Sequence, residues 1–218
     1  MDFKQKNNKP DLVHELELRQ SGCSCVAGLD EAGRGAWAGP VVAAAVVLPI
    51  AQFDLLNQLE GIKDSKLMTH QGRLRGEIRI REVAISIGIG STSAEMVDEV
   101  GIIKATRLAM MEAITSLDVS PSHLLIDHIP LPEVSIVQTV ITKGDLQVLS
   151  IAAASVIAKV TRDSIMVDFG EQFSGYGFSR HKGYGTKEHQ HALADLGPTS
   201  IHRYSFAPVA ARNFFKSH

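Results

Sequence analysis

The sequence has little cysteine and no long hydrophobic run. Among its 218 residues there are only two cysteines, Cys23 and Cys25, which are too few for a disulfide framework or a cysteine-only zinc site. The longest apolar stretch, residues 41–50, contains Pro49 and falls well short of the ~20 residues needed to cross a bilayer. Residues 1–11 are polar and resemble no secretory signal. We therefore expect a cytoplasmic protein with reduced thiols and no membrane association.

The sequence also lacks an excess of positive charge. Its net charge is -2, which by itself argues against a protein that binds nucleic acid. The distribution is uneven, however, because residues 180–218 carry six Lys or Arg against two acids, together with five histidines. A second group of basic residues lies between 63 and 81. For residues 73–81 we favour the interpretation of a solvated surface.

The chain shows no internal repeat and no linker between large domains. Hydrophobic patterning predicts strands over 26–29, 41–48, 83–89, 124–126 and 134–141, and helices over 93–117, 150–169 and 186–194. Hairpin-length links early and a crossover helix later predict an α/β fold, a mixed five-stranded sheet flanked by helices. We expect one domain over 1–218, with a flexible N-terminal tail to about residue 20 and a small C-terminal helical extension over about 186–218.

Adjacent carboxylates interrupt the end of the first predicted strand. Asp30 and Glu31 stand in the sequence GLDEAGRG, residues 28–35. A desolvated carboxylate needs a partner or a metal ion, and both acids can serve one site only near the end of the strand. Asp127 ends another predicted strand, and Asp145 follows the next one. Taken singly, Asp127 or Asp145 is more often a turn cap than a ligand.

Hard oxygen donors of this kind suit Mg²⁺ or Mn²⁺. Two such ions ~4 Å apart stabilise the attacking and the leaving oxygen of an in-line displacement at phosphorus. The four acids together therefore indicate metal-assisted hydrolysis of a phosphate ester. The Gly33-Arg34-Gly35 turn beside them allows close approach to a phosphate backbone.

Seven segments, in order, resemble those of ribonuclease HII and span roughly residues 26–209. They are GLDEAGRG (28–35), GPVVA (39–43), DSK (64–66), KGD (143–145), SIAAASVIAKVTRD (150–163), HKGYGT (181–186) and HRYSF (202–206). Each motif alone is weak, but seven in sequence are specific. The resemblance implies a ribonuclease H-like fold and metal-dependent cleavage of RNA in RNA–DNA hybrids. It also implies cleavage 5′ to single ribonucleotides in duplex DNA, which leaves 5′-phosphate and 3′-hydroxyl ends.

The resemblance also implies roles for individual residues. Asp30, Glu31, Asp127 and Asp145 match the family's metal-binding carboxylates, with two Mg²⁺ or Mn²⁺ ions when substrate is bound. Gly33, Arg34 and Gly35 match the turn that contacts the ribose 2′-hydroxyl, the group that distinguishes RNA from DNA. Tyr184 matches a tyrosine that packs on a sugar, and its alternative role is that of an aromatic covering the core. Lys66, Lys159 and Lys182 are candidates for phosphate contacts, although Lys159 is equally well interpreted as snorkelling from the sheet surface.

The sequence departs from the family pattern at four places near these motifs: His128 with the apolar loop 129–132, Leu67 where a second lysine is frequent, Trp37, and the apolar segment 146–149. None of them removes an acidic residue. His189 and His191 do not face each other on a helix, so we favour hydrogen-bonding or solvent roles over zinc binding. Phe214-Phe215 resembles the end of a sliding-clamp-binding peptide only in general, and docking on the domain itself is preferred. We expect a monomer.

Three other functions compete with this one. A small-molecule phosphatase needs no flanking basic loops, and a non-catalytic hybrid-binding module predicts the loss of at least one acid. A dinucleotide site fails because a β-branched run follows the glycines where a helix must begin. The sister type, ribonuclease HIII, is disfavoured by Arg34 and by the lack of a large N-terminal extension.

Overall fold

Five strands form a mixed sheet in residues 9–213, the part of the chain that this computed structural model describes. The strands are β1 (Val26–Ala32), β2 (Val41–Val47), β3 (Ser86–Thr92), β4 (His123–Asp127) and β5 (Val137–Ile141). Their order across the sheet is β3-β2-β1-β4-β5. β1, β2 and β3 are antiparallel, whereas β4 and β5 run parallel to β1. The predicted mixed sheet is therefore confirmed.

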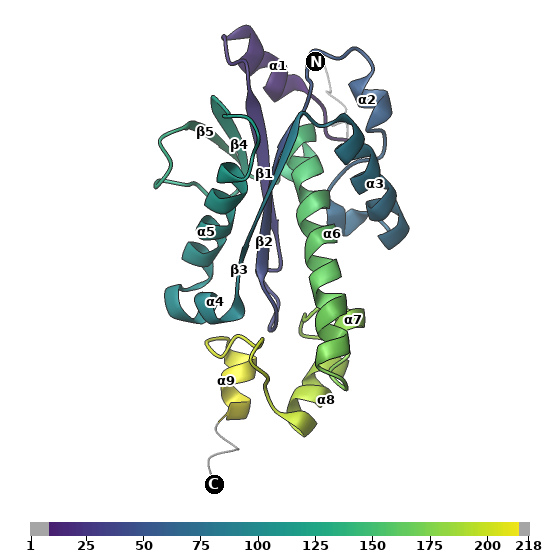
Figure 1. Ribbon diagram of the computed structural model, residues 1–218, viewed down its shortest axis with the longest axis vertical. Coiled ribbons are helices and arrows are strands. Elements are labelled where there is room, and N and C mark those ends of the chain that lie inside the picture. The colour runs from purple at the N-terminus through teal and green to yellow at the C-terminus, as the bar shows by residue number, and fades with distance from the viewer. Residues whose placement is uncertain (1–8, 214–218) are drawn as a thin grey trace, which may run out of the picture.

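Helices cover both faces of the sheet (Figure 1). α6 (Leu149–Gln172) packs on one face, and α4 (Ala94–Val100) with α5 (Ile102–Thr115) packs on the other. β2 is buried along its whole length, since Ala44 and Val46 join the core under α6 while Ala43 and Ala45 join the core under α5. Small side chains at these positions let the helix axes approach the sheet closely. This close packing places the middle of α6 beside the end of β1.

The remaining helices lie at the edges of this sandwich. They are α1 (Val13–Gln20), α2 (Leu55–Gln58), α3 (His70–Val83), α7 (Phe178–His181), α8 (Lys187–Leu196) and α9 (Ala207–Asn213), with short 3₁₀ turns η1 (Ser65–Leu67) and η2 (Gly144–Leu146). α7, α8 and α9 gather near the end of α6 (Figure 1), and an apolar cluster that includes Phe178 and Ala192 joins α7 and α8 to it. α8 and α9 fall in the predicted C-terminal extension. No helix of the described residues is long and apolar enough to cross a membrane.

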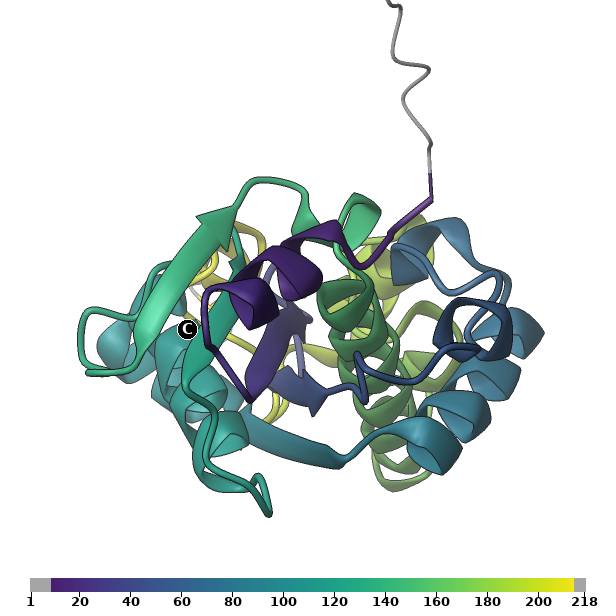
Figure 2. The same cartoon turned by 90° about the horizontal axis from the view of Figure 1, so that it is seen from above.

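Residues 13–20, which fall within the predicted flexible N-terminal tail and overlap a short amphipathic segment expected over 12–18, are helical. They form α1, which lies beside the start of α6 (Figure 2). The buried carboxylate of Glu15 accepts a hydrogen bond of 2.9 Å from the backbone N–H of Ser150. This contact satisfies an N–H of the first turn of α6 that has no partner within the helix, and so it fixes α1. Residues 1–8 of the predicted tail lie outside the described residues.

Several predicted boundaries also move. Residues 83–85, predicted to begin a strand, instead end and follow α3, a helix that the sequence analysis interpreted only as basic surface. The link from β2 to β3 therefore contains α2, η1 and α3 and is no hairpin. The helix predicted over 93–117 is two helices, because Gly101 adopts a φ of 80° that ends α4. β1 continues through Ala32, so Asp30 and Glu31 lie within it.

Candidate active site

The register of the central strands brings three predicted acids to one region. Asp30 and Glu31 lie near the carboxyl end of β1, and Asp127 is the last residue of β4. Leu29 pairs with Ile126 on the parallel neighbour, so Asp30 and Asp127 occupy the next level of the two strands. Side chains at the same level of adjacent strands point to the same face of a sheet. The sheet thus places these two carboxylates side by side.

Asp145 reaches the same region from η2. The backbone N–H of Gly144 donates a 2.7 Å hydrogen bond to Oδ1 of Asp127, which ties η2 to the end of β4. Burial, followed by the charges of Asp64 and Asp127, raises the pKa of Asp145 to about 6, against the effect of Lys66. Asp64 is a fifth acid near the site. Asp64 is the first residue of the DSK segment (64–66), and no role was predicted for it from the sequence.

Asp30 is the most deeply buried of the acids, with 3% of its surface exposed. Its Oδ1 accepts a 2.7 Å hydrogen bond from the backbone N–H of Glu31, while its buried Oδ2 has no hydrogen-bond partner among the described residues. Burial, followed by the charges of Glu31 and Asp127, raises the pKa of Asp30 well above its usual value. The hydroxyl of Ser155 on α6 opposes this rise. A charged Asp30 would therefore be stabilised by an added cation.

Glu31 faces the turn that follows β1. Its Oε1 accepts a 3.1 Å ion-paired hydrogen bond from Arg34 Nη1, whereas its Oε2 is buried without a partner. Burial raises the pKa of Glu31, and the charge of Arg34 opposes that rise. For Lys66, burial lowers the pKa, yet Asp64, Asp30, Asp145 and Glu31 together raise it above its usual value. The ammonium group of Lys66 thus lies in the field of the acidic cluster.

The acidic cluster has donors for a cation but no complete cage. Two buried carboxylate oxygens, one on Asp30 and one on Glu31, lack partners. Nevertheless, within residues 9–213 no three His, Cys, Asp or Glu side chains are grouped so that they hold a metal ion by themselves. Oxygen ligands from outside the protein are needed to complete a shell. This fits Mg²⁺, which usually keeps several waters and shares ligands with substrate phosphates.

A cavity of about 520 Å³ adjoins the acids and collects most of the predicted site residues. Seven of them line it: Glu31, Gly33, Arg34, Gly35, Lys66, Lys159 and Tyr184. Asp30, Asp127 and Asp145 do not line it, but the charge of Asp127 raises the pKa of Glu31 and that of Asp30 raises the pKa of Lys66. The cavity offers the carboxylate of Glu31, the side chain of Arg34, the backbone groups of the glycine turn and an aromatic ring to one ligand.

Two buried arginines shape the glycine turn. Arg203 Nη1 donates to the carbonyl oxygens of Arg34 at 2.9 Å and Ala36 at 2.8 Å. Arg162 Nε donates to the carbonyl oxygen of Pro40 at 2.8 Å. Gly33 has a φ of 95°, and a Cβ added there would overlap the side chain of Arg162. The turn is therefore held rigidly from below, with its upper face toward the cavity.

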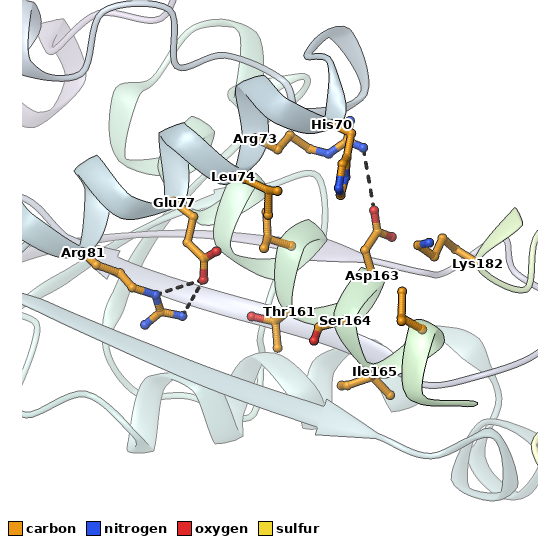
Figure 3. A pocket seen from close by; sticks show the side chains of 12 residues that line it. His70, Arg73, Leu74, Glu77, Arg81, Thr161, Asp163, Ser164, Ile165 and Lys182 are labelled. Atoms are coloured by element: carbon orange, nitrogen blue, oxygen red, sulfur yellow. Dashed lines mark hydrogen bonds and ion pairs between the residues drawn. The ribbon is translucent and has the colours of Figure 1, made fainter. Parts of the chain in front are cut away.

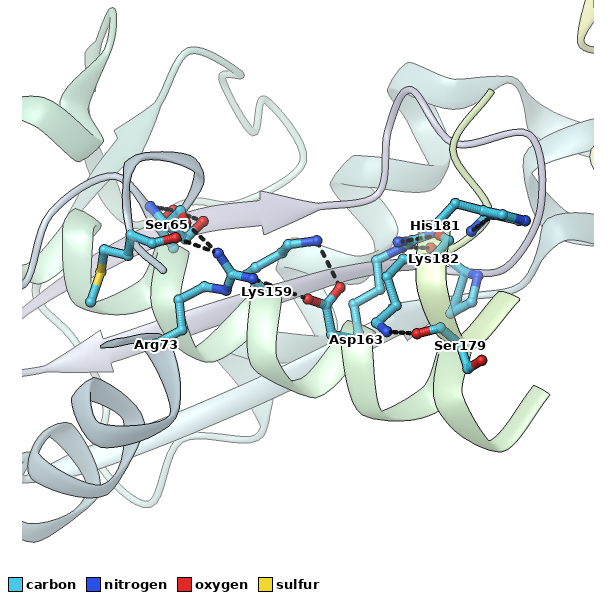
Figure 4. A network of polar contacts seen from close by, with 12 residues as sticks. Ser65, Arg73, Lys159, Asp163, Ser179, His181 and Lys182 are labelled. Carbon is cyan, nitrogen blue, oxygen red and sulfur yellow. Dashed lines mark hydrogen bonds and ion pairs between the residues drawn. The ribbon is translucent and has the colours of Figure 1, made fainter. Parts of the chain in front are cut away.

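Tyr184 lies over two cationic side chains. Its ring centroid is 5.3 Å from Lys159 Nζ and 5.2 Å from Arg162 Cζ, within the range of cation–π attraction. Lys159 Nζ also donates a 2.7 Å hydrogen bond to Asp163 (Figure 4), so Lys159 is an ion-paired residue of the cavity wall. The ring of Tyr184 thus has cationic support where it lines the cavity.

Arg73 corrects the interpretation of residues 73–81 as solvated surface. Its Nη1 donates to the carbonyl oxygens of Ser65 at 3.0 Å and Met68 at 2.7 Å, and its side chain is mostly buried (Figure 4). Arg73 lines both the active-site cavity and a second groove of about 550 Å³ between α3 and α6 (Figure 3). Lys182 lines this groove and not the active-site cavity. Lys182 therefore belongs to the neighbouring groove, together with Asp163, the ion-pair partner of Lys159.

Ser155, Arg162 and Arg203 are site residues that the sequence analysis missed. Ser155 Oγ lies 3.0 Å from Ser65 Oγ and also contacts Asp30, so it links α6 to η1 beneath the acids. All three occur in segments that the analysis quoted. The sequence feature that could have identified them is a polar or charged residue within a segment that is otherwise apolar.

Comparison with known proteins identifies the family. The model of the family "Ribonuclease HII" matches residues 27–209. A ribonuclease HII from Chloroflexus aurantiacus is 48% identical over 200 residues, 92% of this chain and 94% of the relative. The chain belongs to the ribonuclease HII family. Membership makes it a nuclease, a metal-dependent hydrolase.

Solved structures agree with the fold of a ribonuclease HII. The ribonuclease H2 of Pyrococcus horikoshii has a TM-score of 0.74 at 22% identity, covering 89% of this chain and all of that one. The ribonuclease HII of Archaeoglobus fulgidus, solved in complex with PCNA, has a TM-score of 0.70 at 28% identity, covering 84% and 95%. Bst-RNase HIII, solved with Mn²⁺, has a TM-score of 0.69 at 18% identity, covering 93% and 73%.

Proposed function

We propose that this nuclease hydrolyses the RNA strand of RNA–DNA hybrids and cuts 5′ to ribonucleotides embedded in duplex DNA. The observation that carries the proposal is one cavity in which Glu31 lies beside the Gly33-Arg34-Gly35 turn and Tyr184. In this cavity, a carboxylate suited to metal-assisted cleavage lies beside groups that can contact the sugar of the substrate. A small-molecule phosphatase has no use for the ring and the turn together.

Asp30, Glu31, Asp127 and Asp145 are the proposed metal-binding residues. The unpartnered oxygens of Asp30 and Glu31 and the raised pKa values of Asp30, Glu31 and Asp145 support the assignment, since a divalent cation relieves both features. Mg²⁺ or Mn²⁺ fits an all-oxygen donor set, and Mn²⁺ is the ion in the Bst-RNase HIII structure. We propose two ions when substrate is bound. When bound, such ions would lower the pKa of a water molecule and offset charge on the reacting phosphate. Attack of that water on phosphorus with departure of the 3′-oxygen leaves 5′-phosphate and 3′-hydroxyl ends.

The protein's own residues orient the substrate. Gly33 and Gly35 have no side chains, so the backbone of the turn is open to a ribose 2′-hydroxyl, while Arg34 stays paired with Glu31. Tyr184 offers a ring for the next sugar, supported from behind by Lys159 and Arg162. Lys66 is the most exposed cation of the cavity and is proposed to contact a backbone phosphate. Lys182, in the neighbouring groove, is proposed to contact a phosphate farther along the duplex.

We also propose a cellular location, a protein partner and an oligomeric state. Cys23 and Cys25 are both free thiols, which suits the cytoplasm. The archaeal relative was solved with PCNA, so a sliding clamp is a proposed partner. Phe214-Phe215, the pair considered for that contact, lies outside the described residues. A single domain acting as a monomer remains our proposal.

The deciding experiment uses three matched duplexes that carry, at one position, a ribonucleotide, a deoxynucleotide or a 2′-O-methyl nucleotide. With Mg²⁺ or Mn²⁺, the protein is expected to cut only the first, on its 5′ side, and a chelator is expected to stop it. Asp30→Asn should abolish cleavage. Asp168→Asn, at an exposed position of α6, should not. Equal cleavage of the all-DNA duplex, or full activity of Asp30→Asn, would refute the proposal.

A further inference from the structure

Three histidines lie buried beneath the loop that carries Tyr184. His181 belongs to α7, His189 to α8 and His202 to the segment before α9, and none is more than 8% exposed. The rings of His181 and His189 stack with centroids 4.6 Å apart. Family membership assigns these side chains no chemistry in the cavity, and no metal group forms from them among the described residues. Their hydrogen bonds suggest another role.

The hydrogen bonds determine which nitrogen of each ring carries the proton. His189 Nδ1 lies 3.0 Å from the carbonyl oxygen of Tyr184, which only accepts, so Nδ1 must donate. His202 Nδ1 accepts the backbone N–H of Thr199 at 2.9 Å, so its neutral ring carries the proton on Nε2. The Nε2 atoms of His189 and His202 are 3.0 Å apart. The proton on His202 therefore points at the lone pair of His189.

These contacts form one directed chain. The N–H of Thr199 donates to His202, His202 donates to His189, and His189 donates to the carbonyl of Tyr184. Burial lowers the pKa values of His189 and His202 to about 4, so both rings are neutral near pH 7. Reversing either ring would bring two donors or two acceptors together. The chain therefore has a single allowed arrangement.

The backbone of Tyr184 is held on both sides by this cluster. Its N–H donates to the carbonyl oxygen of His181 at 3.0 Å, and its carbonyl accepts from His189 and from the N–H of Thr186 at 2.8 Å. His181 itself is fixed, because its Nδ1 accepts the N–H of Gly183 at 3.1 Å. Lys159 and Arg162 support the ring of Tyr184 from below but contact none of its backbone groups.

We propose that His189 and His202 are positioning residues for Tyr184, acting through a chain of fixed tautomers that ends on the Tyr184 carbonyl. The inference rests on the proposed contact between Tyr184 and the substrate sugar. The histidines touch no substrate. They set where the ring stands relative to the Gly33-Arg34-Gly35 turn, and thereby the spacing between the two sugars that the cavity holds.

The first test needs no variant and no cleavage. Long-range ¹⁵N–¹H spectra of the full chain at pH 7 report the tautomer of each histidine. His189 is expected as the Nδ1–H form and His202 as the Nε2–H form. An Nε2–H form of His189 would overturn the proposal, because its Nδ1 would then have no proton for Tyr184.

The second test separates the two ends of the His189 ring. His189→Asn keeps an amide nitrogen near the Nδ1 position and the contact to Tyr184, whereas His189→Gln keeps a group near Nε2 and the contact to His202. With the ribonucleotide duplex, KM is expected to rise roughly three- to tenfold for Gln, as for one lost hydrogen bond, and less than about twofold for Asn. kcat should stay within about twofold, because the sugar contact is made in the ground state and the transition state alike.

His191→Gln is the matched control, since His191 is an exposed neighbour on the same helix. A purely structural role predicts similar unfolding midpoints and an unchanged KM for Asn and Gln, and equal KM values would overturn the proposal. The amide signal of Thr186, which shares the Tyr184 carbonyl, should shift more in Gln than in Asn. If the wild type fails to cut the ribonucleotide duplex, the proposed function fails, while the tautomers and the Thr186 signal still decide the positioning role.

Discussion

Gly33 rests directly on the side chain of Arg162. A Cβ added to Gly33 would overlap Arg162, and the backbone of Gly33 has a φ of 95°, a conformation that residues with a Cβ rarely adopt. Arg162 in turn donates to the carbonyl oxygens of Pro40, Ala38 and Lys182. One buried guanidinium therefore supports both the glycine turn and the loop that leads to Tyr184.

The contact predicts an unusually large effect of Gly33→Ala. The positive φ alone costs about 1–2 kcal/mol, and the overlap with Arg162 adds to it. Gly22→Ala isolates the first term, because Gly22 has a φ of 94° and open space around its Cβ position. Urea unfolding should show a larger loss of unfolding free energy for Gly33→Ala, together with loss of cleavage. Equal losses for the two variants would contradict the role of Arg162.

Arg203→Met should destabilise the fold strongly. Its guanidinium is fully buried and donates to the carbonyl oxygens of Arg34, Ala36 and Gly39. Each orphaned buried acceptor costs about 1–3 kcal/mol, so we expect a total loss of at least about 3 kcal/mol in chemical denaturation. Arg180→Met is the control, because Arg180 is exposed and makes only a surface ion pair with Glu188. A loss below 1 kcal/mol for Arg203→Met would show that water replaces these contacts.

The contribution of Asp145 to the stability of the metal-free protein should fall as the pH rises from about 4 to about 6. Asp145 has a pKa of about 6 in the fold against an ordinary 3.8, so the native state binds more protons in this window. Stability then falls with rising pH. Asp145→Asn should remove this slope and gain about 1 kcal/mol at pH 7, after allowance for solvent screening. Denaturation curves in chelator across the pH range, with Asp168→Asn beside them, provide the measurement.

Divalent cations should reverse that loss. An ion that binds only the folded state raises its stability by mass action. At pH 7 we expect Mg²⁺ or Mn²⁺ to raise the melting temperature of the wild type and of Asp168→Asn, but much less that of Asp127→Asn. The same rise in Asp127→Asn would place the ion away from the acidic cluster.

The buried histidines should produce the opposite slope at acid pH. Burial lowers the pKa values of His189 and His202 to about 4, against 6.5 when unfolded. Their contribution to stability is therefore complete above pH 6.5 and is lost as the pH falls through 4. His181 and Glu188 are the titratable neighbours that also face them. His202→Gln should weaken this dependence of the unfolding free energy on pH below 6.5, whereas His191→Gln should leave it unchanged.

The sequence predicted the acidic cluster because its physical reason is local. Asp30 and Glu31 stand near the end of a buried strand, where a carboxylate without a partner has a high desolvation free energy. The glycines that follow them predict a turn. The continuous apolar run of residues 41–48 likewise predicted β2, and the apolar stretch 150–169 with its small residues predicted the long buried helix α6. Such patterns follow from the spacing of neighbouring residues, which the chain carries without its fold.

Only the tertiary structure decided which distant groups meet. Strand register set Asp30 level with Asp127, and the N–H of Gly144 brought Asp145 to them. Arg203 supports the glycine turn from more than 160 residues away in the sequence, so no pattern of neighbouring residues predicts the contact. The same holds for the histidine chain beneath Tyr184. A hydrogen bond depends on direction as well as on residue type, and direction is fixed only when the whole chain is packed.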